Sequence, residues 1–554
     1  MDGQGTTEER FVSGVDRLAA FLEKDRLNLW MTFVYVLVIA VIRDLSEYFL
    51  LDDAFTSSSH PWIYSISHHV AFFVLVYLGL ILILKVFSGA GLKKCINYTN
   101  WYYWIILIPP WVDHFLFGQD RNYAYFSWTS FLEAFFGMSG ESFHPGQGVE
   151  VIVVLFALFA YVFWRHRDEL HDMRGRLVLV LRMGSMAAFT VLFMFIIGTP
   201  GAYIPVGSVD GLPVFPSFDL TRYYQYHLFI FAYYYTAALL LVLVLSYISL
   251  RGRFSEYARA LRPFQTVFFA SIVTAGVAFG WRSAILADLV GNILTKPYWV
   301  NLAFVVPTVL TAILAWQIGV LWNDISDRST DDPGKKGRLL ASGVLDPRSL
   351  RDVSVVLTMV VLGVSLLLSV QQFLLMAAVL LLSYAYSCPP FRMKKMLFSP
   401  LLMGLGTFLA FLFGAMTPYS EVSFVSGLPY ITGSVIEPGL TSDALLVGAF
   451  MFLGLVIGSM VTDVDGYAED RAAGVRTIYT QLGRERGTKV VAALVFLASL
   501  SPLVSFNDTL DLLAFPVLGA MAALGFVRTK RSRAVMGFAA VGLIYAMARF
   551  LMGL

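Results

Sequence analysis

The sequence has 554 residues, of which 58% are hydrophobic and only 14% are charged. A soluble globular domain has about a quarter charged residues, so this composition excludes an ordinary soluble protein and is typical of a helical membrane protein. The net charge of +2 gives no indication of a nucleic-acid partner.

The chain begins with a polar segment, residues 1–27, that lacks the residue order of a cleavable signal peptide. Its "FVSGVDRLAAFL" part is weakly amphipathic and predicts a helix on the membrane surface. Apolar runs near the roughly 20 residues of a spanning helix follow. Six of them lie at 28–50, 67–88, 101–117, 149–165, 177–197 and 225–250. Nine more lie at 263–283, 299–321, 351–370, 371–386, 398–416, 443–462, 488–505, 511–527 and 534–552.

The loops between these runs alternate between rich and poor in Lys and Arg. Cytoplasmic loops are enriched in basic residues, which places "RHRDELHDMRGR", "FRMKK" and "RTKRSR" inside. We therefore predict a multi-pass protein of the cell membrane with a cytoplasmic N-terminus. Cys95 and Cys388 both fall on the cytoplasmic side, where we expect neither a disulfide nor a cysteine-only metal site.

The polar, basic loop "RGRFSEYARALRP" is the best internal boundary. Pro263 at its end is suited to the first turn of a helix, where its missing N–H is not needed. We divide the chain into a cytoplasmic segment at 1–27, a domain at 28–255 and a domain at 256–554.

A first acidic segment, "NDISDRSTD", follows the apolar run at 299–321. On a helix, Asp324, Asp327 and Asp331 fall within an arc of roughly 60°, and Asn323 borders the same face. Three carboxylates this close repel one another unless cations join them, and oxygen ligands suit Mg²⁺. An ordinary solvated turn is the alternative for this segment taken alone.

A second acidic segment, "TDVDGYAEDRAAGVRT", ends the apolar run at 443–462 on the same side of the membrane. If the helix continues, Asp463 and Asp470 share a face about 10 Å apart along the axis, with Gly466 between them. Asp465 then points the other way. Two facing sets of carboxylates suit two Mg²⁺ ions around one diphosphate.

A third stretch, "YSCPPFRMKK", lies between the acidic segments in sequence and also on the inner side. Two consecutive prolines end the helix before it. Arg392 and Lys394 are suited to neutralising a diphosphate, with an ordinary basic cytoplasmic loop as the alternative.

Together these residues resemble the UbiA-type intramembrane prenyltransferase superfamily, most closely in its chlorophyll-synthase-like branch. The first signature of that family, Asn-Asp-x-x-Asp-x-x-x-Asp, is complete here, and "RLLASG" at 338–343 and "DRAAGVRT" at 470–477 also fit. Many members carry an aspartate where this chain has Gly466. The chlorophyll-synthase-like branch instead spaces two aspartates seven residues apart, as Asp463 and Asp470 are.

The resemblance implies an all-α polytopic fold, with a nine-helix UbiA-type bundle preceded by an extra bundle of about six transmembrane helices. It implies Mg²⁺-dependent transfer of a polyprenyl group from a polyprenyl diphosphate to a hydrophobic aromatic or lipid acceptor in the membrane, with release of diphosphate on the cytoplasmic side. The implied catalytic metal ligands are Asn323, Asp324, Asp327, Asp331, Asp463 and Asp470. The implied diphosphate contacts are Arg392, Lys394, Arg338 and Arg471, and Tyr386 either lines the substrate pocket or packs as an ordinary aromatic.

All eight histidines lie before residue 228, in the half without a recognised relative. His68, His114, His144 and His227 map to the outer side and form a speculative metal or acid–base site. The rings of His68 and His69 are expected on different sides of their helix. Interfacial or hydrogen-bonded histidines are the alternative.

A membrane transporter or lipid scramblase that uses the acidic segments as ion sites is the second functional class. That class predicts charged residues near the centres of the helices, whereas these charges gather at one membrane edge.

Overall fold

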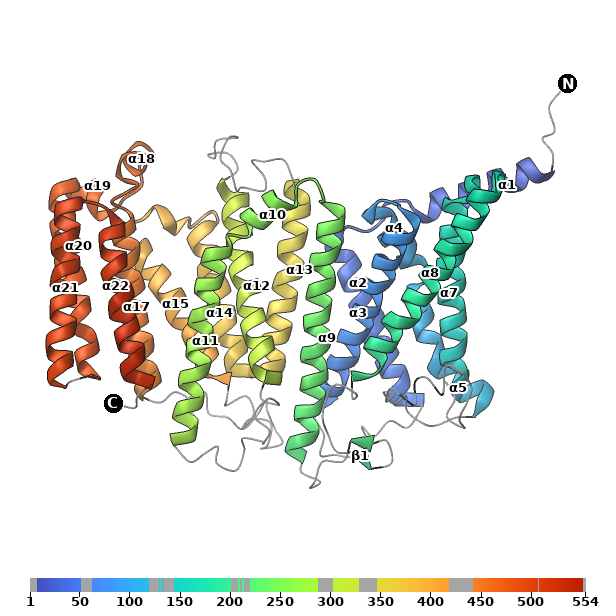
Figure 1. Cartoon of the computed structure of the whole chain (residues 1–554), viewed down its shortest axis with the longest axis horizontal. Helices are drawn as coiled ribbons and strands as arrows, with labels where there is room; N and C mark the ends of the chain where they lie inside the picture. Colours follow the sequence, from blue (N-terminus) through green and yellow to red (C-terminus); the bar gives the residue numbers. More distant parts are fainter. Residues whose placement is uncertain are drawn as a thin grey trace.

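The computed structural model describes residues 7–50, 62–118, 129, 131, 133, 144–200, 208–209, 212–213, 220–286, 302–327, 346–417, 442–506 and 508–551. Its long helices stand side by side, with the N-terminal helices at one end of the row and the C-terminal helices at the other (Figure 1). The predicted all-α fold is confirmed. Within the described ranges, the strands are β1 (Ser208–Val209) and β2 (Leu212–Pro213), which pair antiparallel in a small hairpin.

The helices divide at the predicted internal boundary. The first part contains α1 (Thr7–Leu22), α2 (Leu29–Leu50), α3 (Trp62–Ser88), α4 (Leu92–Tyr102), η2 (Tyr103–Leu107), α5 (Ile108–Phe117), α7 (Pro145–Arg165), η3 (Arg167–His171), α8 (Met173–Gly198), α9 (Leu220–Ser249) and α10 (Phe254–Ala260). The second part contains α11 (Pro263–Leu286), α12 (Leu302–Asp327), α13 (Pro347–Leu368), α14 (Val370–Ser387), η6 (Met393–Lys395), α15 (Ser399–Ala415), α17 (Ser442–Thr462), α18 (Tyr467–Ala472), α19 (Ile478–Leu482), α20 (Arg484–Leu500), η7 (Ser501–Val504), α21 (Thr509–Thr529) and α22 (Ser532–Leu551).

Twelve of the described helices are long and apolar enough to span a membrane, so the protein is an integral, multi-pass membrane protein. The fifteen expected crossings remain a prediction. The run expected at 101–117 is divided between the end of α4, the 3-10 helix η2 and α5. Pro109 and Pro110 lie at the start of α5, and each lacks the N–H that a continuous helix needs there.

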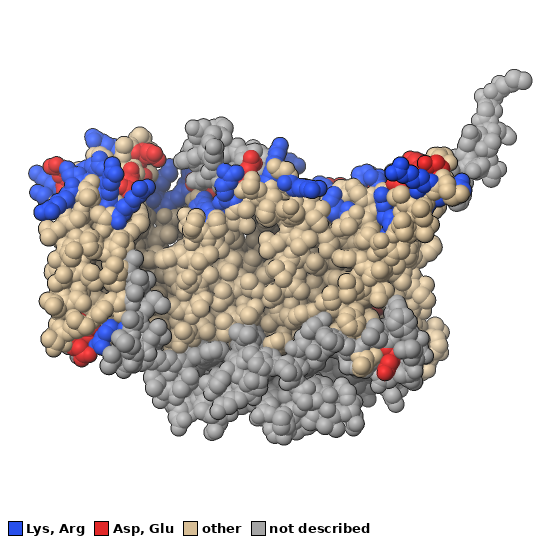
Figure 2. Space-filling view, viewed as in Figure 1, with Lys and Arg blue, Asp and Glu red and all other residues tan. Residues whose placement is uncertain are grey.

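Lys and Arg gather at one end of the helix row, whereas the middle of the visible face is free of charge (Figure 2). We call this end the basic end; it is formed by residues 89–94, 166–176, 251–262, 388–398, 463–486 and 529–533. The end of α12 and the short helix α18 both lie there (Figure 1). Both acidic segments therefore lie at the same end of the bundle.

The short link predicted between residues 370 and 371 is a single residue in the structure. Ser369 has extended backbone, and its hydroxyl accepts a hydrogen bond from the backbone N–H of Gln372, which caps the start of α14. The side chain of Gln372 in turn donates to the carbonyl of Phe413 at 3.1 Å. The hairpin α13–α14 is thereby tied to α15.

The closest helix packing around the second half joins α11 and α15. A Cβ added at Gly414 would lie 2.1 Å from the carbonyl oxygen of Val273, and one at Gly276 would lie 2.1 Å from that of Phe411. Small residues let two helix backbones approach in this way. This contact holds α11, which starts next to Arg262, against the middle of the bundle.

The two predicted domains share part of their core. Phe231 and Tyr235 of α9 belong to one buried cluster with Phe304 and Ile318 of α12. The hydroxyl of Tyr235 also lies 3.4 Å from the Oγ1 of Thr311. The boundary near residue 255 coincides with the short helix α10, but packing continues across it.

Candidate active site

The first acidic segment occupies the last turn of α12 at the basic end. Asp324 is 2% exposed, and its Oδ1 accepts a hydrogen bond from the guanidinium of Arg262 at 2.9 Å. Arg262 immediately precedes α11, so this ion pair joins the end of one helix to the start of another. The sequence analysis assigned no role to Arg262; its signal was a basic residue directly before a helix-starting proline on the inner side.

Asp327, one turn further along α12, is bound by two cations of the basic loop, residues 388–395. The ammonium of Lys394 lies 2.6 Å from each carboxylate oxygen of Asp327 and 2.7 Å from the Oδ1 of Asn323. Arg392 donates to Asp327 at 3.0 Å and to the carbonyl of Ser326 at 2.8 Å. The predicted metal ligands and diphosphate contacts of these two segments therefore lie together.

Both arginines that bind this acidic segment have a left-handed backbone, with φ of 48° at Arg262 and 45° at Arg392. Such a conformation costs roughly 1–2 kcal/mol in a residue other than glycine. Non-glycine residues with this backbone concentrate at sites whose surroundings impose it. Here the cost positions two guanidinium groups on the carboxylates of one helix end.

The second acidic segment departs from its predicted geometry. The expectation that Asp463 and Asp470 share one continuous helix is wrong, because α17 ends at Thr462, residues 463–466 form a turn, and α18 starts at Tyr467. Aspartate and glycine favour a turn over helix continuation. Asp465 points away as predicted: its carboxylate accepts a hydrogen bond from the hydroxyl of Ser532 on α22.

Asp463 and Asp470 nevertheless remain electrostatically coupled. Burial raises the pKa of Asp463 to about 7, and the negative charge of Asp470 adds to the effect. Burial, followed by the charge of Glu469, raises the pKa of Asp470. Within the described ranges, no Lys or Arg forms an ion pair with either carboxylate. The pair thus lacks the cations that hold the first acidic segment.

Two contacts connect the second acidic segment to the first. The backbone N–H of Arg476 donates to the carbonyl of Lys395 at 3.1 Å, which ties the segment after α18 to the basic loop. The charges of Asp463 and Asp327 both act on the hydroxyl of Tyr386 near the end of α14. The basic loop and Tyr386 therefore lie between the two acidic segments.

A second tyrosine, which the sequence analysis missed, marks the inner side of Asp463. Tyr479 of α19 is fully buried, and its pKa is raised by burial and by the charges of Asp463 and Asp465. Its hydroxyl has no hydrogen-bond partner within the described ranges. Nothing in the local sequence "TIYTQL" distinguishes this tyrosine from a packed aromatic.

Other predicted residues lie apart from these contacts or beyond the description. Arg471 is exposed and donates to the hydroxyl of Tyr467 at 3.2 Å. Asp331 and Arg338 lie outside the described residues. The described acidic residues do not form a complete metal-binding group of three or more.

The donor set nevertheless fits a hard divalent cation. Asn323, Asp324, Asp327, Asp463 and Asp470 offer only oxygen atoms, which is the ligand type of Mg²⁺. The raised pKa of Asp463 reports buried negative charge that a cation would offset.

The speculative histidine site is only partly placed. The rings of His68 and His69 do not lie on different sides; their centroids are 4.0 Å apart, and His69 contacts the carboxylate of Asp44. Adjacent rotamers that bend toward one carboxylate override the 100° helical separation. His114 lies on α5, and His144 precedes α7. No metal-binding group forms among the described histidines, and the side chain of His227 lies outside the description.

Comparisons with known proteins bear on the second half of the chain. Residues 284–536 match the model of the UbiA prenyltransferase family. The chain is 24% identical over 234 residues to the bacteriochlorophyll synthase 34 kDa chain of Chloroflexus aurantiacus, covering 42% of this chain and 64% of that relative. It is 29% identical over 266 residues to the lycopene elongase/hydratase of Halobacterium salinarum, covering 46% and 82%. It is 28% identical over 184 residues to the digeranylgeranylglyceryl phosphate synthase of Korarchaeum cryptofilum, covering 33% and 56%.

The chain therefore spans less than two thirds of the length of two of these relatives. Among solved structures, a digeranylgeranylglyceryl phosphate synthase aligns with a TM-score of 0.39 at 15% identity, covering 54% of this chain and 96% of that chain. A UbiA homologue of Archaeoglobus fulgidus bound to GPP and Mg²⁺ aligns with a TM-score of 0.35 at 17% identity, covering 53% and 98%.

Proposed function

Because residues 284–536 form a domain of the UbiA prenyltransferase family, we propose that the protein is a Mg²⁺-dependent prenyltransferase. It transfers a polyprenyl group from a polyprenyl diphosphate to an aromatic or lipid acceptor in the membrane and releases diphosphate. One observation carries the proposal: the basic loop binds Asp327 through Lys394 and is hydrogen-bonded through Lys395 to the second acidic segment. Cations are thus placed between two acidic segments, where a diphosphate and its metal ions need them.

The metal ligands in this proposal are Asn323, Asp324, Asp327 and Asp331 in the first segment and Asp463 and Asp470 in the second. Mg²⁺ held there offsets the negative charge that grows on the leaving diphosphate. Arg262 keeps Asp324 ionised and oriented, because an adjacent cation favours the charged carboxylate.

The basic loop supplies the direct contacts to the diphosphate. When Asp327 binds a metal ion, it no longer needs Lys394 and Arg392 as its counter-ions. Both side chains are then available to the diphosphate oxygens, as Lys and Arg commonly bind phosphate. Arg338 and Arg471 are additional candidates for this role, and Tyr386 lines the space between the acidic segments.

The apolar helices around the site exclude water from the reacting carbon. Cleavage of the allylic C–O bond leaves a carbocation-like centre, which water would quench. The prenyl chain extends between the helices into the bilayer. The density of Lys and Arg at the basic end supports a cytoplasmic position for the site and for the N-terminus.

Diphosphate release by the purified full chain tests this function. With geranylgeranyl diphosphate, Mg²⁺ and candidate acceptors, Asp324→Asn, Asp327→Asn and Asp463→Asn should each lower release by at least 100-fold, as loss of a key electrostatic group does. Asp465→Asn is the matched control, since that carboxylate binds Ser532 instead. Full release in the three variants would refute the role assigned to the acidic segments and favour a transporter.

A further inference from the structure

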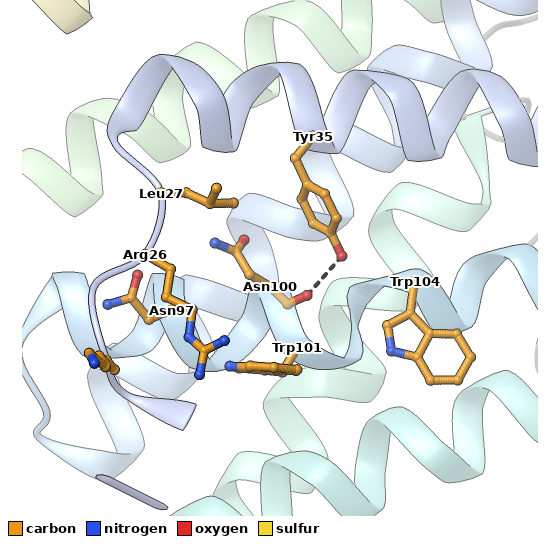
Figure 3. A pocket seen from close by; sticks show the side chains of 8 residues that line it. Arg26, Leu27, Tyr35, Asn97, Asn100, Trp101 and Trp104 are labelled. Atoms are coloured by element: carbon orange, nitrogen blue, oxygen red, sulfur yellow. Dashed lines mark hydrogen bonds between the residues drawn. The ribbon is translucent and has the colours of Figure 1, made fainter. Parts of the chain in front are cut away.

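A cavity of about 350 Å³ opens at the basic end of the first half of the chain, outside the residues that match the UbiA family. It lies between the linker before α2, α2 itself, α4 and η2 (Figure 3). This volume is at the lower end of the range of roughly 300–1,000 Å³ for small-molecule pockets. It has room for a headgroup but not for a whole lipid.

Two cations line the cavity without a carboxylate partner. Lys24 and Arg26 form no ion pair within the described part of the chain. The acidic residues beside them in sequence are bound elsewhere: Glu23 lies 2.7 Å from the ammonium of Lys94, and Asp25 pairs with Lys93. The cavity wall therefore carries positive charge that the surrounding residues do not offset.

Aromatic contacts fix one of these cations in place. The guanidinium carbon of Arg26 lies 4.1 Å from the ring centroid of Phe21 and 4.9 Å from that of Trp101. Figure 3 shows Arg26 and Trp101 together at one edge of the cavity and Trp104 at another. A cation held on aromatic faces keeps its hydrogen-bond donors free for an anion.

A neutral donor completes the polar wall. The Oδ1 of Asn100 accepts a hydrogen bond from Tyr77 at 2.6 Å, and its backbone carbonyl accepts one from Tyr35 at 2.7 Å (Figure 3). These bonds fix the side chain so that its amide nitrogen remains as the donor. No printed contact within the described ranges uses that nitrogen.

The outer rim of the cavity is apolar and suited to the membrane surface. Trp101 is 38% exposed and Trp104 is 49% exposed. Helix α1, which leads to the cavity, exposes Leu18 and Phe21. Tryptophan concentrates where lipid headgroups meet acyl chains, and amphipathic helices lie at the same depth.

We infer that this cavity binds the phosphate group of an amphiphile. Arg26 and Lys24 bind the phosphate oxygens, and the Asn100 amide donates to a further oxygen. The apolar chain leaves past Trp101 and Trp104 into the bilayer. An anionic bilayer phospholipid, an isoprenoid diphosphate and free phosphate share the recognised group.

Native mass spectrometry of the full chain tests the inference with three separate probes: phosphatidylglycerol, geranyl diphosphate and inorganic phosphate. The titrations contain EDTA, which removes the divalent ions that the proposed active site requires. Each cation near a membrane surface contributes about fivefold to the affinity for an anionic lipid, so Lys24→Gln/Arg26→Gln should bind roughly 25-fold more weakly. Arg174→Gln/Arg251→Gln removes the same charge at exposed positions of the basic end and should bind like the wild type.

A second variant separates the cavity from surface charge alone. Leu27→Trp keeps both cations and narrows the cavity, so it should also weaken binding, with folding checked by thermal unfolding. The probe that binds identifies the source of the phosphate. The inference is overturned if no probe binds the wild type, if the Lys24→Gln/Arg26→Gln or Leu27→Trp variant binds like it, or if the Arg174→Gln/Arg251→Gln control loses as much affinity.

Discussion

Replacing Lys394 with glutamine separates two possible functions of one ammonium group. In the structure this group lies 2.6 Å from each oxygen of Asp327 and 2.7 Å from the Oδ1 of Asn323, and its side chain is 15% exposed. A hydrogen bond to a charged group contributes roughly 1.5–3 kcal/mol, or about 10- to 150-fold. If Lys394 transfers from Asp327 to the diphosphate, Lys394→Gln should lower kcat/KM for the prenyl diphosphate by that factor.

The same variant should change the Mg²⁺ requirement in the opposite direction. Lys394 competes with a metal ion for Asp327, so its removal should lower the half-saturating Mg²⁺ concentration. Diphosphate release is measured against each concentration in turn. Lys395→Gln is the matched control, because its exposed side chain forms no ion pair within the described residues and only its backbone carbonyl contacts Arg476.

The reasoning is refuted if Lys394→Gln leaves kcat/KM unchanged. It is also refuted if the variant raises the half-saturating Mg²⁺ concentration, since Lys394 would then support metal binding instead of competing with it.

Three further predictions concern the ion pairs, the pH dependence and the helix packing. Arg262→Gln removes an ion-pair partner of a carboxylate that is 2% exposed, so unfolding should become easier by about 2–4 kcal/mol, and Arg262→Gln/Asp324→Asn should lose less; equal losses in a detergent unfolding titration would contradict this. Burial raises the pKa of Asp463 from 3.8 to about 7, and a ligand carboxyl must lose its proton, so Mg²⁺ affinity measured by calorimetry should rise as pH increases up to about 7 and then level off; an affinity that is flat between pH 5 and pH 7 would exclude Asp463 as a ligand. Gly414→Ala should lower the thermal stability by about 1–3 kcal/mol because the new Cβ would lie 2.1 Å from the carbonyl oxygen of Val273, whereas Gly406→Ala on the same helix meets nothing within 4 Å and should not.

The long-range order of the fold could be read from the sequence. Apolar runs and the alternation of basic loops predict which helices cross and which ends lie together, because lipid permits few other arrangements. The single-residue link at Ser369 was likewise expected from two adjacent apolar runs. Both depend on local composition alone.

Contacts between segments that are distant in sequence could not be predicted this way. The pairing of Arg262 with Asp324 spans 62 residues and depends on how α11 packs against its neighbours. The turn at 463–466 depends on a competition between helix continuation and turn formation, which periodicity does not resolve. The burial of Tyr479 follows from the position of α19 in the bundle, and nothing in its own sequence marks it.

The position of divalent metal in the full chain tests the account most directly. Crystals grown with Mn²⁺ in place of Mg²⁺, together with geranylgeranyl diphosphate, can be measured at the manganese absorption edge. We expect anomalous density beside Asp324 and Asp327, further density beside Asp463 and Asp470, and the diphosphate between them in contact with Lys394. Metal bound elsewhere, or a diphosphate that leaves both acidic segments untouched, would contradict the account.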